Sequence, residues 1–221
     1  MTYCLGIKTR SGIVAMADTR LTSGNECSTG KKMFSYNNDS RTVFLMTSGL
    51  RSVRDKTLTY FKEILESKST QHNKLYKMVN TFAELLRQVA KEDKKYLEES
   101  GLKFNLNTII GGQMEEDEEH KLYLLYPEGN WIEIGQESGS PFIIIGNSGF
   151  LSFDSTRVSA NDVDFPLDIA IYPANSHSLI EYRLERDDVK QISEYWQGIL
   201  SDGIDNIPSD WMLPILGNLG K

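Results

Sequence analysis

The chain has 221 residues, of which 39% are hydrophobic, and its formal net charge is −7. This acidic balance disfavours binding to nucleic acid or to an anionic membrane, because phosphate contacts require a basic excess. No apolar run reaches the roughly 18 residues of a membrane span, and no basic segment followed by an apolar core marks a secretion signal. We therefore expect a cytoplasmic protein with a substantial buried core.

Cysteine and histidine usage is sparse. Cys4 and Cys27 are too few for a disulfide framework, and both are compatible with reduced thiols, although the sequence leaves a pairing between them open. The histidines His72, His120 and His177 lack the spacing of metal ligands. We expect neither a metal nor an organic cofactor.

The first fifty residues predict two β-hairpins. Residues 2–8 and 13–20 are strand-like runs joined by the glycine turn "TRSG". Residues 31–36 and 41–49 are a second pair, joined by the turn "NNDS". The chain therefore begins with antiparallel sheet.

Two helices follow the hairpins. Residues 50–67 place most of their apolar side chains on one helical face. Residues 74–101 follow the i, i+3, i+4, i+7 pattern more closely, and Gly101 is a suitable stop.

Strands then return, and the chain ends with helical spacing. The predicted strands cover residues 103–112, 121–126, 130–135, 141–146, 167–172 and 179–185, and the predicted C-terminal helix covers residues 187–203. Between two of these strands lies the charge run "MEEDEEH", which we interpret as a solvated hairpin loop.

This order predicts an α+β fold. No linker, repeat or low-complexity tract divides the chain, so we expect one domain over residues 1–221. Two sheets packed face to face, with helices on the outside, would bury the apolar faces of all these elements.

Thr2 is the first candidate for chemistry. If Met1 is removed, the Thr2 hydroxyl lies beside a free α-amine with an ordinary pKa of about 7.7–8.0. Such an amine is partly neutral near pH 7 and accepts the hydroxyl proton, so that one residue supplies nucleophile and base. On its own a Met-Thr start is weak evidence, because many proteins begin this way.

Three further residues lie where strands end. Asp18 ends the second predicted strand in "ADTR", Lys32 begins the third in "GKKMF", and Gly49 ends the fourth in "MTSG". A lysine near Thr2 would lower the pKa of its amine, and an aspartate would hold that lysine charged and oriented. A backbone N–H at Gly49 would serve as an oxyanion donor, and glycine allows a substrate backbone to approach.

These segments resemble a proteasome β-subunit, and more closely the Anbu family, the bacterial "ancestral β-subunit" proteins of proteasome type. The resemblance covers most of the chain. It is carried by "MTYC", "ADTR", "KKM" and "TSG", and further by "IIGGQ", "YPEGNWIE", "IGNSG", "SFDST", "FPLDIAIY", "RDDVKQISEYWQGI" and "IPSDW".

The resemblance implies a four-layer αββα sandwich of the N-terminal-nucleophile hydrolase type. It implies Thr2 as the nucleophile, Asp18 and Lys32 as its acidic and basic partners, and Gly49 as the oxyanion glycine. It also implies that Ser148, in "GNSG", helps to position the N-terminal amine.

A substrate pocket is implied at Arg20, Thr47 and Arg51. Thr47 and Arg51 match positions that line the specificity pocket of proteasome subunits, and Arg20 is adjacent to the strand that carries Asp18. If both arginines face the pocket, acidic side chains before the scissile bond are favoured. The alternative for both arginines is a solvated surface.

The sequence departs from the family at two places. Almost nothing separates "IGNSG" from "SFDST", where the family has a helix and the start of another, so an outer helix is lost or a stretch is missing. The segment "VSANDVD" puts Ala160 and Asp162 where the family places groups near the free amine, with Asn161 as a substitute if the register slips.

Three functions follow from this reading. The first is a threonine peptidase that cleaves peptides or proteins after Met1 is removed, and that forms rings or helical homo-oligomers. The second is a self-assembling proteasome-like module whose catalytic set is residual. The third is an amidase acting on a small molecule, because the fold does not fix the substrate. The sequence identifies no ATPase partner.

Overall fold

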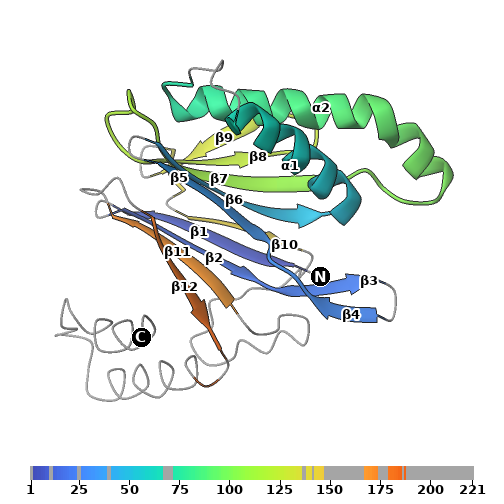
Figure 1. The fold of residues 1–221 in the computed structure, drawn as a ribbon, viewed down its shortest axis with the longest axis horizontal. Helices are drawn as coiled ribbons and strands as arrows, with labels where there is room; N and C mark the ends of the chain where they lie inside the picture. The colour runs from blue at the N-terminus through green and yellow to red at the C-terminus, as the bar shows by residue number, and fades with distance from the viewer. Residues whose placement is uncertain are drawn as a thin grey trace.

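The computed structural model describes residues 2–9, 12–23, 26–38, 41–66, 72–135, 138–140, 142–146, 167–173, 179–185 and 187. Within these residues the chain forms a layer of helices on a sandwich of two β-sheets (Figure 1). The predicted α+β fold is confirmed. None of the described helices is long and apolar enough to cross a membrane.

The sheet beneath the helices has five strands in the order β5-β6-β7-β8-β9, all antiparallel. Its strands are β5 (Met33–Asn38), β6 (Arg41–Gly49), β7 (Leu106–Gln113), β8 (Lys121–Leu125) and β9 (Trp131–Ile134). Each strand lies beside its neighbour in sequence, as hairpin-rich sequences favour.

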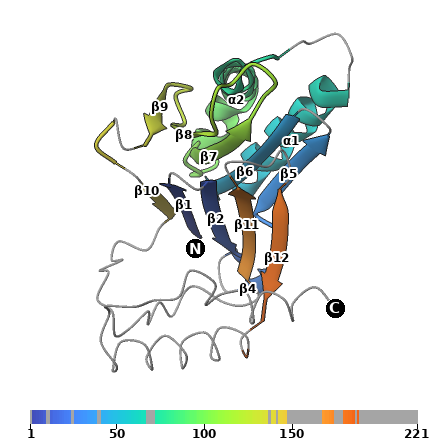
Figure 2. The ribbon, with the colours of Figure 1, turned by 90° about the vertical axis from the view of Figure 1, so that its left-hand side faces the viewer.

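The second sheet assembles strands from both ends of the chain, in the antiparallel order β10-β1-β2-β11-β12 (Figure 2). Its strands are β1 (Tyr3–Thr9), β2 (Gly12–Asp18), β10 (Phe142–Gly146), β11 (Leu167–Pro173) and β12 (Ile180–Leu184). The first strand is therefore central in this sheet, with a partner on either side.

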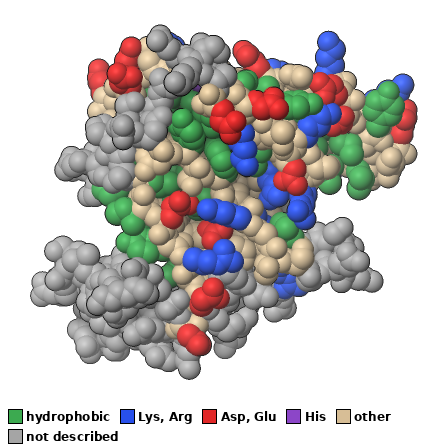
Figure 3. Space-filling model, in the orientation of Figure 1, with side chains coloured by type: hydrophobic (Ala, Val, Ile, Leu, Met, Phe, Trp, Pro, Cys, Tyr) green, Lys and Arg blue, Asp and Glu red, His purple; other side chains and the backbone are tan. Residues whose placement is uncertain are grey.

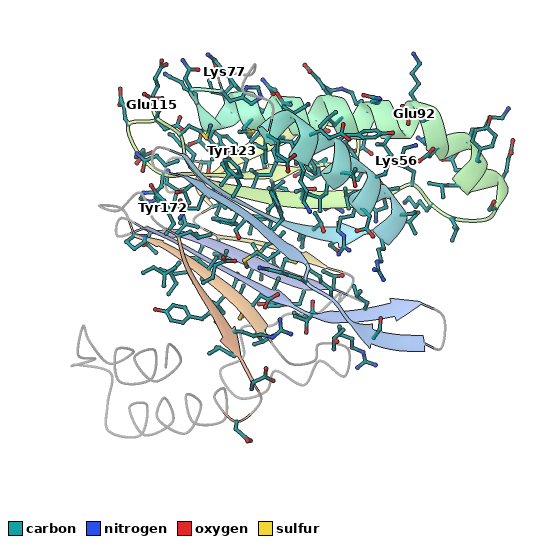
Figure 4. The ribbon with its side chains drawn as sticks, in the orientation of Figure 1. Lys56, Lys77, Glu92, Glu115, Tyr123 and Tyr172 are labelled. Carbon is teal, nitrogen blue, oxygen red and sulfur yellow. The ribbon has the colours of Figure 1, made fainter. Side chains whose placement is uncertain are left out.

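Helices α1 (Arg51–Glu66) and α2 (Leu75–Glu99) cover one face of the first sheet. The rings of Phe61 on α1 and Phe82 on α2 meet edge to face at a centroid distance of 5.2 Å. On the outer side, Lys56 of α1 and Glu92 of α2 point toward one another (Figure 4) and form an ion pair of 2.8 Å. Acidic and basic side chains are interspersed over this helical layer (Figure 3).

A second core fills the space between the two sheets. It includes Ile13, Phe44 and Tyr172, all with no exposed surface. A Cβ at Gly6 would lie 3.3 Å from side-chain atoms of Ile109 on the facing sheet, so glycine matches the close sheet-to-sheet spacing here.

One pair of strands was not predicted. After Asp18 the chain leaves the sheet and forms a separate two-stranded ribbon of β3 (Arg20–Ser23) and β4 (Glu26–Thr29), which projects from one end of the sandwich (Figure 1). The remaining predicted strands and both long helices are confirmed. The predicted helix at residues 187–203, which would form the fourth layer, lies outside the described residues except for residue 187.

The acidic run between β7 and β8 lies in a hairpin connection, as predicted, but part of it has a structural role. The Asp117 carboxylate accepts hydrogen bonds from the backbone N–H groups of Leu75 (2.9 Å) and Met114 (3.0 Å). Lys74, at the N-cap of α2, makes no side-chain cap bond, so Asp117 caps this helix from a distant loop. Burial raises the pKa of Asp117, and the two N–H groups oppose that shift.

Replacing Asp117 by alanine should lower the free energy of unfolding by about 1–2 kcal/mol, because α2 loses its cap. Urea unfolding followed by circular dichroism measures this loss. Glu115→Ala in the same loop is the matched control and should change stability by less than about 0.5 kcal/mol. Equal effects of the two substitutions would contradict the capping role.

The same loop ties the two sheets together through Glu119. Its carboxylate lies 2.9 Å from the ammonium of Lys8 on β1 and 3.1 Å from that of Lys121 on β8. These two lysines hold the pKa of Glu119 at about 2.

A folded-state pKa of about 2 predicts a pH dependence for Glu119. Because this pKa lies below the unfolded value of about 4.3, the contribution is complete above that value and is lost as pH falls toward 2. The difference in urea midpoint between the wild type and Glu119→Gln should therefore shrink between pH 4 and pH 2. A difference that stays constant over this range would show that Glu119 is not held by its lysines.

Candidate active site

Several chain ends converge where the β3–β4 ribbon leaves the sandwich. β1 starts here, β2 ends at Asp18, residues 30–32 lead into β5, and β6 ends at Gly49 just before α1. Figure 1 places the N-terminus at the same end. Antiparallel pairing brings the start of β1 beside the end of β2 in one sheet, and the start of β5 beside the end of β6 in the other. The Asp18–Lys32 ion pair connects these two groups of strand ends.

The Asp18 carboxylate is the centre of this cluster. One oxygen, Oδ1, accepts from the backbone N–H of Tyr3 at 2.7 Å and from the Lys32 ammonium at 2.6 Å. The other, Oδ2, accepts from the backbone N–H of Arg20 at 3.2 Å. Asp18 therefore joins three segments of the chain: the start of β1, the start of the ribbon and the approach to β5.

The Asp18–Lys32 ion pair is buried. The Lys32 side chain is 2% exposed and the Asp18 side chain is fully buried. Burial lowers the pKa of Lys32, while the hydrogen bond and charge of Asp18 oppose this shift. Because a lysine buried without its partner would lose its proton more readily, Asp18 is the group that keeps Lys32 charged.

Thr2 directly precedes β1, and its position is set by its backbone. The peptide unit that joins Thr2 to Tyr3 donates its N–H to Asp18. On the other side, a Cβ at Gly146 of β10 would lie only 2.1 Å from the Thr2 carbonyl oxygen. Any side chain at residue 146 would displace Thr2, which makes Gly146 a functional position that the sequence reading missed. The glycine ending the run "FIIIG" was the available signal.

Cys4 is the other nucleophilic side chain at this end of β1, but its environment is inert. The thiol is fully buried and lies 3.8 Å from the backbone oxygen of Thr47. Burial raises the pKa of Cys4, against the smaller opposing effect of Lys32. A neutral, inaccessible thiol is a packing group, which leaves Thr2 as the candidate nucleophile.

Gly49 occupies a position that only glycine tolerates. Its φ angle is +144°, and a Cβ there would lie 2.2 Å from the carbonyl oxygen of Asn105. The next residue, Leu50, donates its N–H to the same oxygen at 2.8 Å. Gly49 is exposed, so its backbone is accessible to a bound molecule.

A family model described as "Proteasome subunit" matches residues 2–149, which include Thr2, Asp18, Lys32 and Gly49. The chain belongs to the proteasome subunit family. No curated protein matches it.

Solved structures agree with this assignment. The chain is similar to Anbu (ancestral beta-subunit) from Yersinia bercovieri, with 25% identity, a TM-score of 0.77, and coverage of 94% of this chain and 98% of the other. It is also similar to an Anbu (Gly-1) mutant from Hyphomicrobium sp. strain MC1, with 25% identity, a TM-score of 0.76, and coverage of 91% and 97%. A third similar structure is a helical assembly of the Anbu complex from Pseudomonas aeruginosa. It has 23% identity, a TM-score of 0.78, and coverage of 94% of this chain and 98% of the other. The predicted resemblance to Anbu is confirmed.

The pocket residues expected in this proteasome-type chain have different environments. Thr47 is 4% exposed, and the alternation along β6 puts it on the face that packs under the helices. Arg51 is largely exposed and pairs with Asp55 at 3.2 Å, one turn along α1. Arg20 is partly buried, and its backbone N–H is bonded to Asp18. In the sequence, Thr47 and Arg51 flank Gly49, each two residues away from it.

The remaining predicted site residues lie outside the described residues. They are Ser148, expected to position the α-amine, and the segment containing Ala160, Asn161 and Asp162. Their roles stay predictions.

The Asp18–Lys32 pair should show strong energetic coupling. Asp18→Leu and Lys32→Met should each lower stability by about 3–5 kcal/mol, because each leaves a buried charge without its partner. The double variant should cost clearly less than the sum. Chemical unfolding of the four proteins measures the cycle, and the exposed pair Lys94–Glu98 is the control, with coupling below about 0.5 kcal/mol. Additive effects at the buried pair would contradict the proposed interaction.

Proposed function

We propose that this proteasome-type chain is an N-terminal threonine hydrolase that cleaves amide bonds after Met1 is removed, with residues 1–221 forming one domain. The observation that carries the proposal is the Asp18 carboxylate, which binds both the peptide N–H next to Thr2 and the Lys32 ammonium. One buried anion thus binds both the backbone next to the candidate nucleophile and the candidate cation, Lys32.

The first chemical step is attack by the Thr2 hydroxyl oxygen on the amide carbonyl carbon. The hydroxyl proton passes to the free α-amine of Thr2, and the carbonyl electron pair moves onto oxygen. A lysine ammonium close to the α-amine lowers the pKa of that amine, so that more of it is neutral near pH 7. Lys32 fills this role because Asp18 keeps it protonated.

The second step is collapse of the tetrahedral species. The amide C–N bond breaks, the leaving amine takes the proton from the α-ammonium, and the acyl group stays on Thr2 as an ester. Water then attacks the ester carbonyl carbon and gives a proton to the α-amine. The ester C–O bond breaks, the α-ammonium returns the proton to the Thr2 oxygen, and the carboxylic acid product leaves. In our proposal the Gly49 backbone N–H stabilises the oxyanion in both steps, because a fixed N–H dipole at such a site needs little reorganisation.

Substrate preference is assigned to Thr47, Arg20 and Arg51. Arg51 shares Asp55 with Arg54, so two cations face one anion in the first turns of α1. This positive excess favours an acidic side chain next to the scissile bond. The substrate class we propose is therefore a peptide with an acidic residue before the cleaved amide.

We also propose that the chain forms a homo-oligomer. One similar structure is a helical assembly of the Anbu complex, and the others are likewise Anbu proteins. The altered segment "VSANDVD" favours a second candidate function, a self-assembling module without useful activity. The two candidates differ in the reactivity of Thr2.

A peptide carrying a threonine-reactive electrophile, such as an epoxyketone, should form one covalent adduct at Thr2, detected by intact mass and peptide mapping. Thr2→Ala should abolish the adduct, and Thr9→Ala, at the far end of β1, should leave it unchanged. Labelling that persists in Thr2→Ala would place the reactive group elsewhere. An unlabelled wild-type protein with Thr2 as its first residue would favour the assembly module.

Arg51→Glu tests the substrate class. Reversing this charge should lower kcat/KM for peptides with an acidic residue before the scissile bond by about tenfold or more, relative to matched neutral peptides. Fluorogenic peptides that differ only at this residue measure the ratio. Acyl-amides of small molecules belong in the same screen, and cleavage of these alone would indicate a small-molecule amidase. An unchanged peptide ratio would remove Arg51 from the pocket.

A further inference from the structure

Arg54 makes contacts behind the candidate site that the roles assigned above do not explain. It lies in the first turns of α1, and its side chain is only 12% exposed. Its guanidinium binds Asp55 through Nε at 2.8 Å and Nη2 at 2.7 Å. The remaining nitrogen, Nη1, lies 3.5 Å from the backbone oxygen of Lys31.

The location is electrostatically costly for an arginine. The N-terminal end of a helix carries a partial positive charge, which disfavours cations, and α1 has no acidic residue in its first turn. Arg54 also lies close enough to Lys32 to affect its titration, so two cations share this region. Asp55 offsets part of this repulsion. The remaining repulsion is not offset by Asp55, and the contact of Arg54 with the Lys31 carbonyl suggests a role in positioning that segment.

That contact links two parts of the candidate site. The Lys31 carbonyl belongs to the peptide unit that joins Lys31 to Lys32. Arg54 lies five residues after Gly49, near the start of α1. The guanidinium therefore connects the segment that carries the cation to the helix that follows the oxyanion glycine. Asp18 makes the corresponding connection between the Lys32 ammonium and the peptide next to Thr2.

We propose that Arg54 is a positioning residue of this site, which holds the Lys31–Lys32 peptide against the first turns of α1 and so fixes Lys32 relative to Gly49. The consequence for Thr2 reactivity rests on the proposed function, whereas the contact itself does not.

The groups around Lys32 define what a change at Arg54 should do. Burial has the largest effect on Lys32 and lowers its pKa. Asp18, from β2, raises it through its hydrogen bond and charge, and Arg54, from α1, lowers it, while the neighbouring Cys4 thiol on β1 is neutral. The Lys31 ammonium turns away to Glu181 on β12, at 3.4 Å. Removing the Arg54 charge should therefore raise the pKa of Lys32, because a nearby like charge has gone.

The experiment combines a titration with a reactivity measurement on the full chain. Lysine labelled with ¹³C at Cε is titrated by NMR, and Lys32→Arg identifies the Lys32 signal. The rate of adduct formation with the epoxyketone peptide is measured in the same proteins. The variants are Arg54→Met, which removes charge and contact, and Arg54→Lys, which keeps the charge without the guanidinium. Lys62→Met, further along α1, is the control.

Arg54→Met should move the Lys32 titration to higher pH and slow labelling about tenfold. Arg54→Lys should leave the titration nearer to the wild type but still slow labelling, and Lys62→Met should change neither. If Arg54→Met does not fold, slower labelling of a folded Arg54→Lys supports the proposal. Wild-type labelling rates in the folded Arg54 variants would overturn it, with or without a changed titration. A wild type that is never labelled refutes the hydrolase instead, and an unchanged Lys32 titration in Arg54→Met then overturns the placement of Arg54 against the Lys31–Lys32 segment.

Discussion

The candidate site depends on one buried carboxylate. Asp18 ends β2 and accepts hydrogen bonds from the start of β1, from the start of the ribbon and from Lys32. A buried carboxylate requires such partners, because desolvation without them would cost more than the fold can offset. The hydrogen bonds that stabilise the buried Asp18 carboxylate therefore also determine where the Thr2–Tyr3 peptide and the Lys32 ammonium lie.

The sandwich holds this arrangement in place from two sides. β1 is a central strand, paired with β2 and β10, so the residue before it has little freedom once both ladders form. On the facing sheet, β6 runs between β5 and β7 and delivers Gly49 at its end. Rigid central strands are a suitable base for a site that requires accurate placement of a nucleophile and its partners.

Much of this could be predicted from the sequence, because the signals were local. Alternating apolar residues and glycine turns gave the strands, and the helical period gave α1 and α2. Asp18, Lys32 and Gly49 could be located because each lies at the end of a strong pattern. The resemblance to proteasome subunits then assigned them roles, which spacing alone could not do.

The features that escaped prediction depend on contacts between distant segments. Gly146 is needed because the Thr2 carbonyl passes beside it, and Asp117 caps a helix that begins 42 residues earlier. Arg54 reads as an ordinary helical residue until its contact with the Lys31 backbone is known. The β3–β4 ribbon was not predicted: the strand before it was predicted to end at residue 20, and its two strands are only four residues each, in the polar stretch "RLTSGNECST".

The proposed mechanism requires a free amine at Thr2, and the intact mass of the protein isolated from its native host tests this most directly. We expect the whole population of mature chains to lack Met1 and to begin at Thr2. A mature chain that retains Met1 would leave Thr2 without its base and would contradict the hydrolase mechanism, whatever the geometry around Asp18.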